Sequence, residues 1–348
     1  MADTKTDENG EDEPEPMLHP DHINCFEYDD DEAALLEEER IGEGLTDWFV
    51  DDTFYGIDAI YFDGLRPPQG ALPADLIQWR RIGKGEVATV DKPILFQKQA
   101  GDKIIIGDLQ QGQLNNKWLT NAFAALTANP NVLDMLFVSS KYRSKGLYTV
   151  KLFKDGRWHY MHIDDRIPVD LSGRPIYLRG VNPNETWSML LEKAYAKLHG
   201  CYESLASGFI DEALRDLTAG ATLYLDLNQG KGEMLKNGEN NELWQFLKNA
   251  IADEAVVTAT RTGFAPIPPN GLSGDAKCRV LEGNAYVVLF AAIIEDPLTK
   301  LKTKIVSLIL PKHKYDTYNI YKHTHIQYIH THTHMTNITY TYTLYIRI

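Results

Sequence analysis

Cysteine is scarce in this sequence, which has only Cys25, Cys201 and Cys278 among 348 residues. They show no pairing pattern, so a disulfide framework is excluded and a reducing compartment is expected. Long apolar runs are also missing, since Val287–Ile294 and Ile305–Leu310 are far shorter than the about 20 residues that span a membrane. The first residues contain no basic stretch followed by an apolar one, and no glycine follows the methionine. We therefore expect no secretion, no myristoylation, no membrane span and a cytoplasmic protein.

An excess of basic residues is absent as well. The formal net charge is −14, and sixteen of the 49 acidic residues lie within residues 1–40, beside only Lys5 and Arg40. The rest of the chain has equal numbers of acidic and basic residues, which argues against a nucleic-acid-binding face. Residues 1–46 are acidic and poor in large apolar side chains, which predicts a disordered tail with a short helix at 33–40.

A thiol is missing where the local pattern would suit one. A polar loop around Gly112 is followed by apolar residues at the spacing of a buried helix face, namely Trp118, Leu119, Ala122, Phe123 and Leu126. The positive end of a helix dipole lowers the pKa of a thiol placed there. The sequence has Lys117 at this point, and an ammonium group supplies no thiolate to attack a carbonyl.

Around this loop the sequence resembles the calpain family of cysteine peptidases, whose signature reads Gln-Gly-x-Leu-Gly-Asp-Cys-Trp. Gln111–Leu114 and Trp118 match it, whereas Asn115, Asn116 and Lys117 replace the Gly, Asp and nucleophilic Cys. The likeness is near-verbatim at 187–197, Trp-Ser-Met-Leu-Leu-Glu-Lys-Ala-Tyr-Ala-Lys. The same segment predicts a helix with one apolar stripe, and Gly200 as its C-cap. Residues 76–220 are thereby identified as calpain-like.

The resemblance implies an α+β, papain-like protease core with a helical first lobe and a β-rich, truncated second lobe. We expect four regions: an acidic tail over 1–46, the first lobe over 47–220, a partial second lobe over 221–310 and a low-complexity tail over 311–348. The last region contains Thr-His repeats. We interpret it as an unselected or frame-shifted terminus rather than a metal site at His330, His332 and His334.

The resemblance also implies a general base and a third catalytic residue. The family's Gly-His-Ala-Tyr context reads Gly283-Asn284-Ala285-Tyr286 here, and an amide takes up no proton near neutral pH. Loss of a general base costs on the order of 10²–10⁴ in rate. The family's third residue, an asparagine before a Pro-Trp-Gly turn, should follow Lys304–Leu310 and is not found.

Three further residues match functional positions of the family. Gln111 matches the glutamine that stabilises the oxyanion. Asp108 and Glu185 fall near positions where the resemblance implies calcium ligands, and the ordinary alternative for both is an exposed surface carboxylate.

His159 and His162 belong to a hairpin predicted around Asp155-Gly156, and because they are three residues apart on a strand they should point to opposite faces. We therefore expect no metal pair there.

Three functions are compatible with the sequence. The first is a calpain-like pseudoprotease whose Cys/His/Asn triad is degraded and which binds a peptide or a cytoskeletal partner without cleaving it. The second is a calcium-dependent cysteine endopeptidase, which family likeness alone would suggest. The third is a truncated gene product without a function of its own. We favour the first, because Cys, His and Asn are all replaced or missing within an otherwise intact frame.

Overall fold

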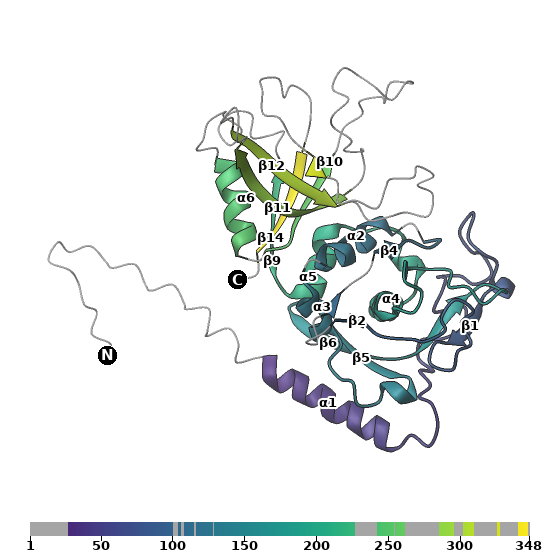
Figure 1. Cartoon of the computed structure of the whole chain (residues 1–348). Coiled ribbons are helices and arrows are strands. Elements are labelled where there is room, and N and C mark those ends of the chain that lie inside the picture. Colours follow the sequence, from purple (N-terminus) through teal and green to yellow (C-terminus); the bar gives the residue numbers. More distant parts are fainter. Residues whose placement is uncertain are drawn as a thin grey trace, which may run out of the picture.

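The computed structural model of the chain (Figure 1) describes eleven stretches of residues. They are 27–99, 104–105, 108–114, 116–127, 129–226, 242–253, 255–261, 285–295, 302–309, 326–327 and 340–346. Two replaced positions of the family motifs, Asn115 and Asn284, lie outside the described residues, as do His330, His332 and His334.

The first lobe consists of helices with several two-stranded antiparallel sheets around them. Its α-helices are α1 (Glu27–Glu43), α2 (Lys117–Leu126), α3 (Pro130–Leu136), α4 (Trp187–Leu198) and α5 (Ile210–Thr218). Its 3-10 helices are η3 (Ala74–Leu76), η4 (Arg143–Lys145) and η5 (Glu203–Ala206). The strands pair as β1 (Gln78–Arg81) with β7 (Arg166–Val169), β2 (Gln97–Lys98) with β3 (Ile104–Ile105), β4 (Leu109–Gln110) with β8 (Arg179–Gly180), and β5 (Leu147–Lys154) with β6 (Arg157–Asp164).

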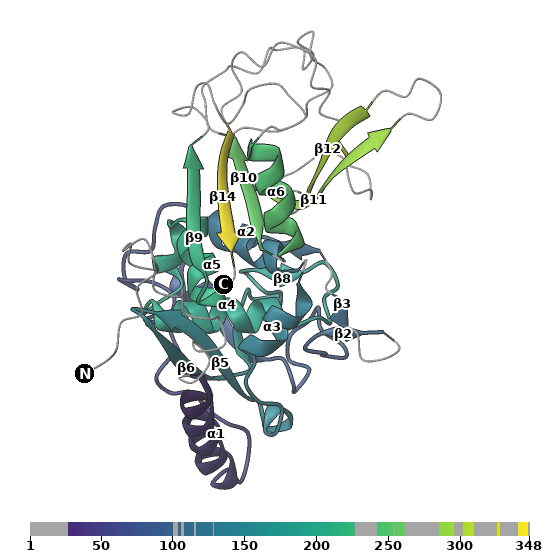
Figure 2. The same cartoon turned by 90° about the vertical axis from the view of Figure 1, so that its left-hand side faces the viewer.

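In its described residues, the second lobe is a six-stranded antiparallel sheet with helix α6 (Glu242–Ala252) packed against it. The strand order is β13-β12-β11-β10-β14-β9. The strands are β9 (Ala221–Asp226), β10 (Val257–Arg261), β11 (Ala285–Glu295), β12 (Lys302–Ile309), β13 (Ile326–Gln327) and β14 (Tyr340–Ile346). Figures 1 and 2 show this sheet beside α2 and α5 of the first lobe, and α2 contacts β11. The α+β class predicted from the sequence is confirmed.

Helix α4 forms the centre of the first lobe. Of its predicted apolar stripe, Trp187, Leu190, Leu191 and Ala194 have no exposed surface, whereas Leu198 at the end of the helix is half-buried. The helix ends at Leu198, and Gly200 follows with a φ of +97°, a conformation that favours glycine. The helix contacts both strands of the β5–β6 hairpin, and also β7, β8 and η5.

The hairpin of β5 and β6 has the predicted turn. Asp155 and Gly156 both have positive φ, +52° and +78°, as a two-residue type I′ turn requires. The strands pair in register from Leu147–Asp164 to Lys154–Arg157. Among the described residues, no group of three or more His, Cys, Asp or Glu side chains is arranged to hold a metal ion.

Both ends of the chain differ from the expected tails where they are described. The short helix expected at 33–40 extends over Glu27–Glu43 as α1, so a helix occupies the second half of the segment expected to be disordered. Asp31 of α1 accepts hydrogen bonds from Lys151 Nζ at 2.9 Å and Tyr160 Oη at 2.5 Å, which explains how an acidic segment docks on the hairpin. At the other end, β14 pairs with both β10 and β9. In the part of the chain that the structure describes, no helix is both long and apolar enough to cross a membrane.

A fully buried ion pair joins α4 to the end of β6. Lys193 Nζ lies 2.5 Å from Asp164 Oδ1 and also donates to the carbonyls of Asp164 and Arg166, at 3.0 and 2.8 Å. Burial opposes the charged form of Asp164, but Lys193 and the Asp51 N–H outweigh it, so the pKa of this carboxyl is lowered. The ammonium therefore ties the hairpin to the core helix.

We expect Lys193→Met to lower the free energy of unfolding by about 1–3 kcal/mol, because the buried Asp164 carboxylate and the carbonyls of Asp164 and Arg166 lose a charged donor, while Arg166 Nε stays 2.5 Å from Asp164 Oδ2. Chemical denaturation at neutral pH measures this change. The matched control is Lys98→Met, at an exposed position of β2, where we expect a change within about 0.5 kcal/mol. An equally small change at Lys193 would contradict the structural role of the pair.

Candidate functional site

The loop that carries the matched signature connects β4 to α2. Strand β4 pairs with β8, and the Gln113 N–H donates to the Ile176 carbonyl at 2.8 Å. A Cβ on Gly112 would lie 2.3 Å from the Tyr177 carbonyl carbon, so only glycine allows the backbone to approach this closely. The loop is therefore held directly against the segment 176–180.

Gln111, predicted to stabilise an oxyanion, is buried in this loop. Its side-chain amide donates a hydrogen bond to the Leu114 carbonyl at 2.9 Å, three residues further along the chain. In this conformation the Gln111 side-chain amide forms a hydrogen bond within its own loop. Its action on a substrate carbonyl stays a prediction.

Lys117 is the first residue of α2, at the helix start that the apolar spacing indicated, and its side chain is exposed. The next residue anchors the helix, because Trp118 Nε1 donates to the Leu205 carbonyl at 2.9 Å and its ring contacts Tyr195 edge-on at 6.0 Å. Lys117 is thus exposed to solvent at the start of a helix that the contacts of Trp118 hold in place. An ammonium group here can donate hydrogen bonds, but it cannot form a thioester with a peptide carbonyl.

The structure adds a buried pair that the sequence did not suggest. Asn116, the N-cap residue of α2, makes no side-chain hydrogen bond to its own helix. Its Nδ2 donates instead to Glu192 Oε1 of α4 at 2.6 Å, while Glu192 Oε2 accepts the Leu178 N–H at 2.9 Å. Both side chains are buried, each with 1% of its surface exposed. The only signal in the sequence was that Glu192 interrupts the most apolar part of a core helix.

Burial raises the pKa of Glu192 to about 7, although the hydrogen bonds from Asn116 and Leu178 favour the charged form. The other titratable groups that face this carboxyl are the phenols of Tyr177 and Tyr202. Burial raises the pKa of both phenols, so they stay neutral at physiological pH. Of Glu192, Tyr177 and Tyr202, Glu192 is therefore the residue whose pKa lies near neutrality.

The second lobe reaches the same region through β11. This strand begins at Ala285, the residue after Asn284, and contacts α2. Val287 is part of the hydrophobic core that first-lobe side chains form. Asn284 itself lies outside the described residues, and so does the chain between β12 and β13.

Comparison with known proteins decides the family. The profile of calpain family cysteine proteases matches residues 49–318. This chain belongs to the calpain family. It is 32% identical over 248 residues to the calpain-type cysteine protease DEK1 of Zea mays, covering 69% of this chain and 11% of that protein. It is 31% identical over 229 residues to Calpain-5 of Caenorhabditis elegans, covering 63% of this chain and 33% of that protein.

Calpain-B of Drosophila melanogaster is 39% identical over 192 residues, which covers 54% of this chain and 19% of that protein. The chain thus spans about a tenth to a third of the length of these relatives. The family assignment concerns the protease-like region alone.

The two carboxylates matched to calpain calcium ligands, Asp108 and Glu185, differ in exposure. Asp108 is exposed, and its carbonyl accepts the Val181 N–H at 2.7 Å. Glu185, four residues after Val181, is fully buried, so it is not an ordinary surface carboxylate. Calcium takes six to eight oxygen ligands, and the described residues contain no cluster of three acidic, His or Cys side chains.

Among the described residues, the free cysteine is Cys201. Cys201 is buried after the end of α4, and burial raises the pKa of its thiol, which disfavours the thiolate. Cys25 and Cys278 lie outside the described residues.

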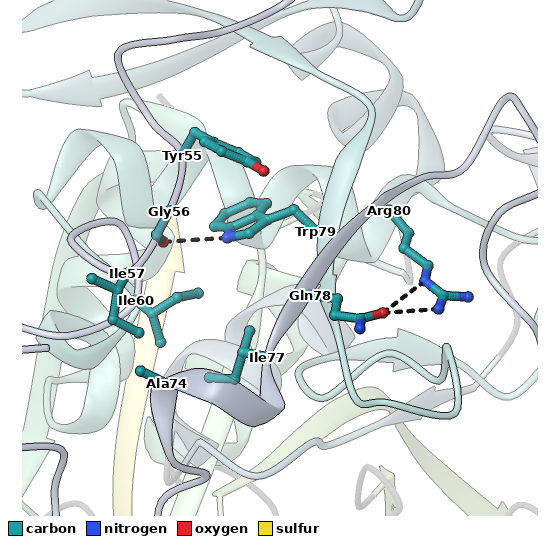
Figure 3. Close-up of a pocket in the computed structure, with 9 residues that line it drawn as sticks. All are labelled: Tyr55, Gly56, Ile57, Ile60, Ala74, Ile77, Gln78, Trp79 and Arg80. Atoms are coloured by element: carbon teal, nitrogen blue, oxygen red, sulfur yellow. Dashed lines mark hydrogen bonds between the residues drawn. The ribbon is translucent and has the colours of Figure 1, made fainter.

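A cavity of about 460 Å³ lies between residues 55–60 and 74–80, below the rings of Tyr55 and Trp79 (Figure 3). None of its lining residues belongs to the loop before α2.

The raised pKa of Glu192 predicts a pH dependence of stability. Between the carboxyl's ordinary value of 4.5 and its folded value of about 7, the folded state holds a proton that the unfolded state has released. Raising the pH through this range therefore favours unfolding. Relative to Glu192→Gln, which does not titrate, we expect the native chain to lose about 2–3 kcal/mol of unfolding free energy between pH 4.5 and about 7.5. Urea denaturation of both proteins across this range measures it, and parallel curves would contradict the assignment.

Proposed function

We propose that this chain is a non-catalytic member of the calpain family that binds extended peptide segments without cleaving them. The observation that supports this most directly is Lys117, an exposed ammonium group at the first residue of α2, in place of the nucleophilic cysteine. The replacement of the general base by Asn284 supports it independently. The surface at the start of α2, next to β11, would hold the peptide.

The partner we propose is a protein or peptide, including components of the cytoskeleton, in the cytoplasm. The packing of the loop before α2 favours binding over mere loss of function. Gly112 packs against Tyr177, Gln111 bonds to the Leu114 carbonyl, and Trp118 bonds to the Leu205 carbonyl, so the loop has a defined shape. The alternative of an active calcium-dependent endopeptidase needs a thiolate and a base. The alternative of a product without function gains support only if the surface binds nothing.

Hydrolysis of fluorescein-labelled casein, with and without millimolar calcium, tests the absence of catalysis. We expect no cleavage by the native chain. In the Lys117→Cys/Asn284→His variant we expect slow cleavage that iodoacetamide blocks, because a thiol at a helix N-terminus is activated. Cleavage by the native chain, blocked by the same reagent, would overturn the proposal.

Fluorescence anisotropy with unfolded, labelled casein tests binding. We expect the native chain to bind, and Lys117→Trp to weaken binding at least tenfold, because a bulky ring would cover the start of α2. The matched control is Lys248→Trp on the exposed face of α6, where affinity should stay within twofold. Equal loss at both positions, or no binding by the native chain, would reject a peptide site at α2.

A further inference from the structure

The loop before α2 depends on one carboxyl group from a distant part of the chain. Glu192 lies 76 residues after Asn116, and its two oxygens accept from two different segments, Asn116 Nδ2 at 2.6 Å and the Leu178 N–H at 2.9 Å. The loop also touches this second segment, since Gln113 donates to Ile176. A single buried side chain therefore joins the end of the loop to the strand-like segment on which the loop rests.

We propose that Glu192 is the positioning residue for the first residue of α2, and that asparagine at 116 is matched to it as a neutral hydrogen-bond donor. This inference goes beyond the proposed function, because it concerns how position 117 is held, whether or not a peptide binds there. Lys117 follows Asn116 directly, so the side chain that fixes the N-cap also fixes the direction in which residue 117 points.

The match follows from the chemistry of the pair. Glu192 offers only acceptors when ionised, and an amide donates to it without any proton being shared. An aspartate at 116, the residue of the calpain signature, would place two carboxyl groups at hydrogen-bond distance in a site with 1% exposure. Two carboxyls so close cannot both ionise, so they would share one proton and titrate as a coupled pair. Asn116 removes that coupling.

A cysteine at position 117 reports on the loop. We would measure the rate of alkylation of Lys117→Cys by iodoacetamide against pH, following residue 117 by mass spectrometry of peptides from the full chain. A thiol fixed at a helix N-terminus should have a lower alkylation midpoint than Lys248→Cys, an exposed mid-helix control on α6.

Four partner variants in the Lys117→Cys background test the pair. Glu192→Gln should keep the midpoint, because the new side-chain amide can accept from the Leu178 N–H and donate to the flipped amide of Asn116. Glu192→Leu should raise the midpoint by at least about one pH unit and slow alkylation at neutral pH about tenfold, because the loop end is released. Asn116→Asp should raise the midpoint and add a second titration step. Asn116→Asp with Glu192→Gln should restore a single step, because donor and acceptor are exchanged.

The rescue by the exchanged pair separates positioning from general stability. The Lys248→Cys midpoint should not change when Asn116→Asp is added. Equal profiles for Asn116→Asp with and without Glu192→Gln, or an unchanged profile in a folded Glu192→Leu variant, would overturn the proposal. If Glu192→Leu does not fold, as circular dichroism would reveal, the Asn116→Asp pair of variants still decides it.

Discussion

Two fully buried ionisable side chains stand side by side on α4, and the first lobe is assembled around what they bond. Glu192 faces the loop before α2, and Lys193 faces the end of β6. Removing a charge from water costs several kcal/mol, which is recovered only when nearly every donor and acceptor is satisfied. The loop and the hairpin therefore have little freedom to shift, because a shift of either would break buried hydrogen bonds of Glu192 or Lys193.

This constraint explains why the fold around the start of α2 does not depend on the side chain at position 117. The residue at the nucleophile position, Lys117, is exposed to water, and in the described part of the chain no hydrogen bond of its side chain holds the fold together. Asn116, Glu192 and Gly112 are enclosed, and their contacts are within hydrogen-bond or van der Waals distance. A substitution at the exposed position 117 should change the free energy of unfolding by less than about 0.5 kcal/mol. Replacing an enclosed side chain by one that cannot form its hydrogen bonds leaves a buried partner unpaired, which costs about 1–3 kcal/mol. The fold therefore depends on the enclosed residues and not on the side chain at position 117.

Local patterns predicted the local structure. The spacing of apolar residues indicated α2 and α4, and Asp155-Gly156 indicated the hairpin turn, because each of these depends on neighbours within a few residues. The Asn116–Glu192 pair and the docking of Asp31 on Lys151 depend on residues 76 and 120 positions apart. A sequence shows that such polar residues exist, but not which partner satisfies them. For the same reason α1 was expected to be shorter than it is, since its acidic residues have partners on a distant hairpin.

The replaced residues at 115–117 are not explained by charge compensation. Relative to the calpain signature, Asp to Asn at 116 and Cys to Lys at 117 both make the start of α2 more positive, at the end of the helix where the dipole is already positive. Such a cost is about 0.3–1 kcal/mol at an exposed position, and Lys117 meets it in water. Asn116 is enclosed, where its hydrogen bond to Glu192 outweighs so small a cost, because a carboxylate there would face a second carboxyl. The surroundings of the two positions therefore differ in what they tolerate. Water surrounds the side chain at 117, and Glu192 of α4 contacts the side chain at 116.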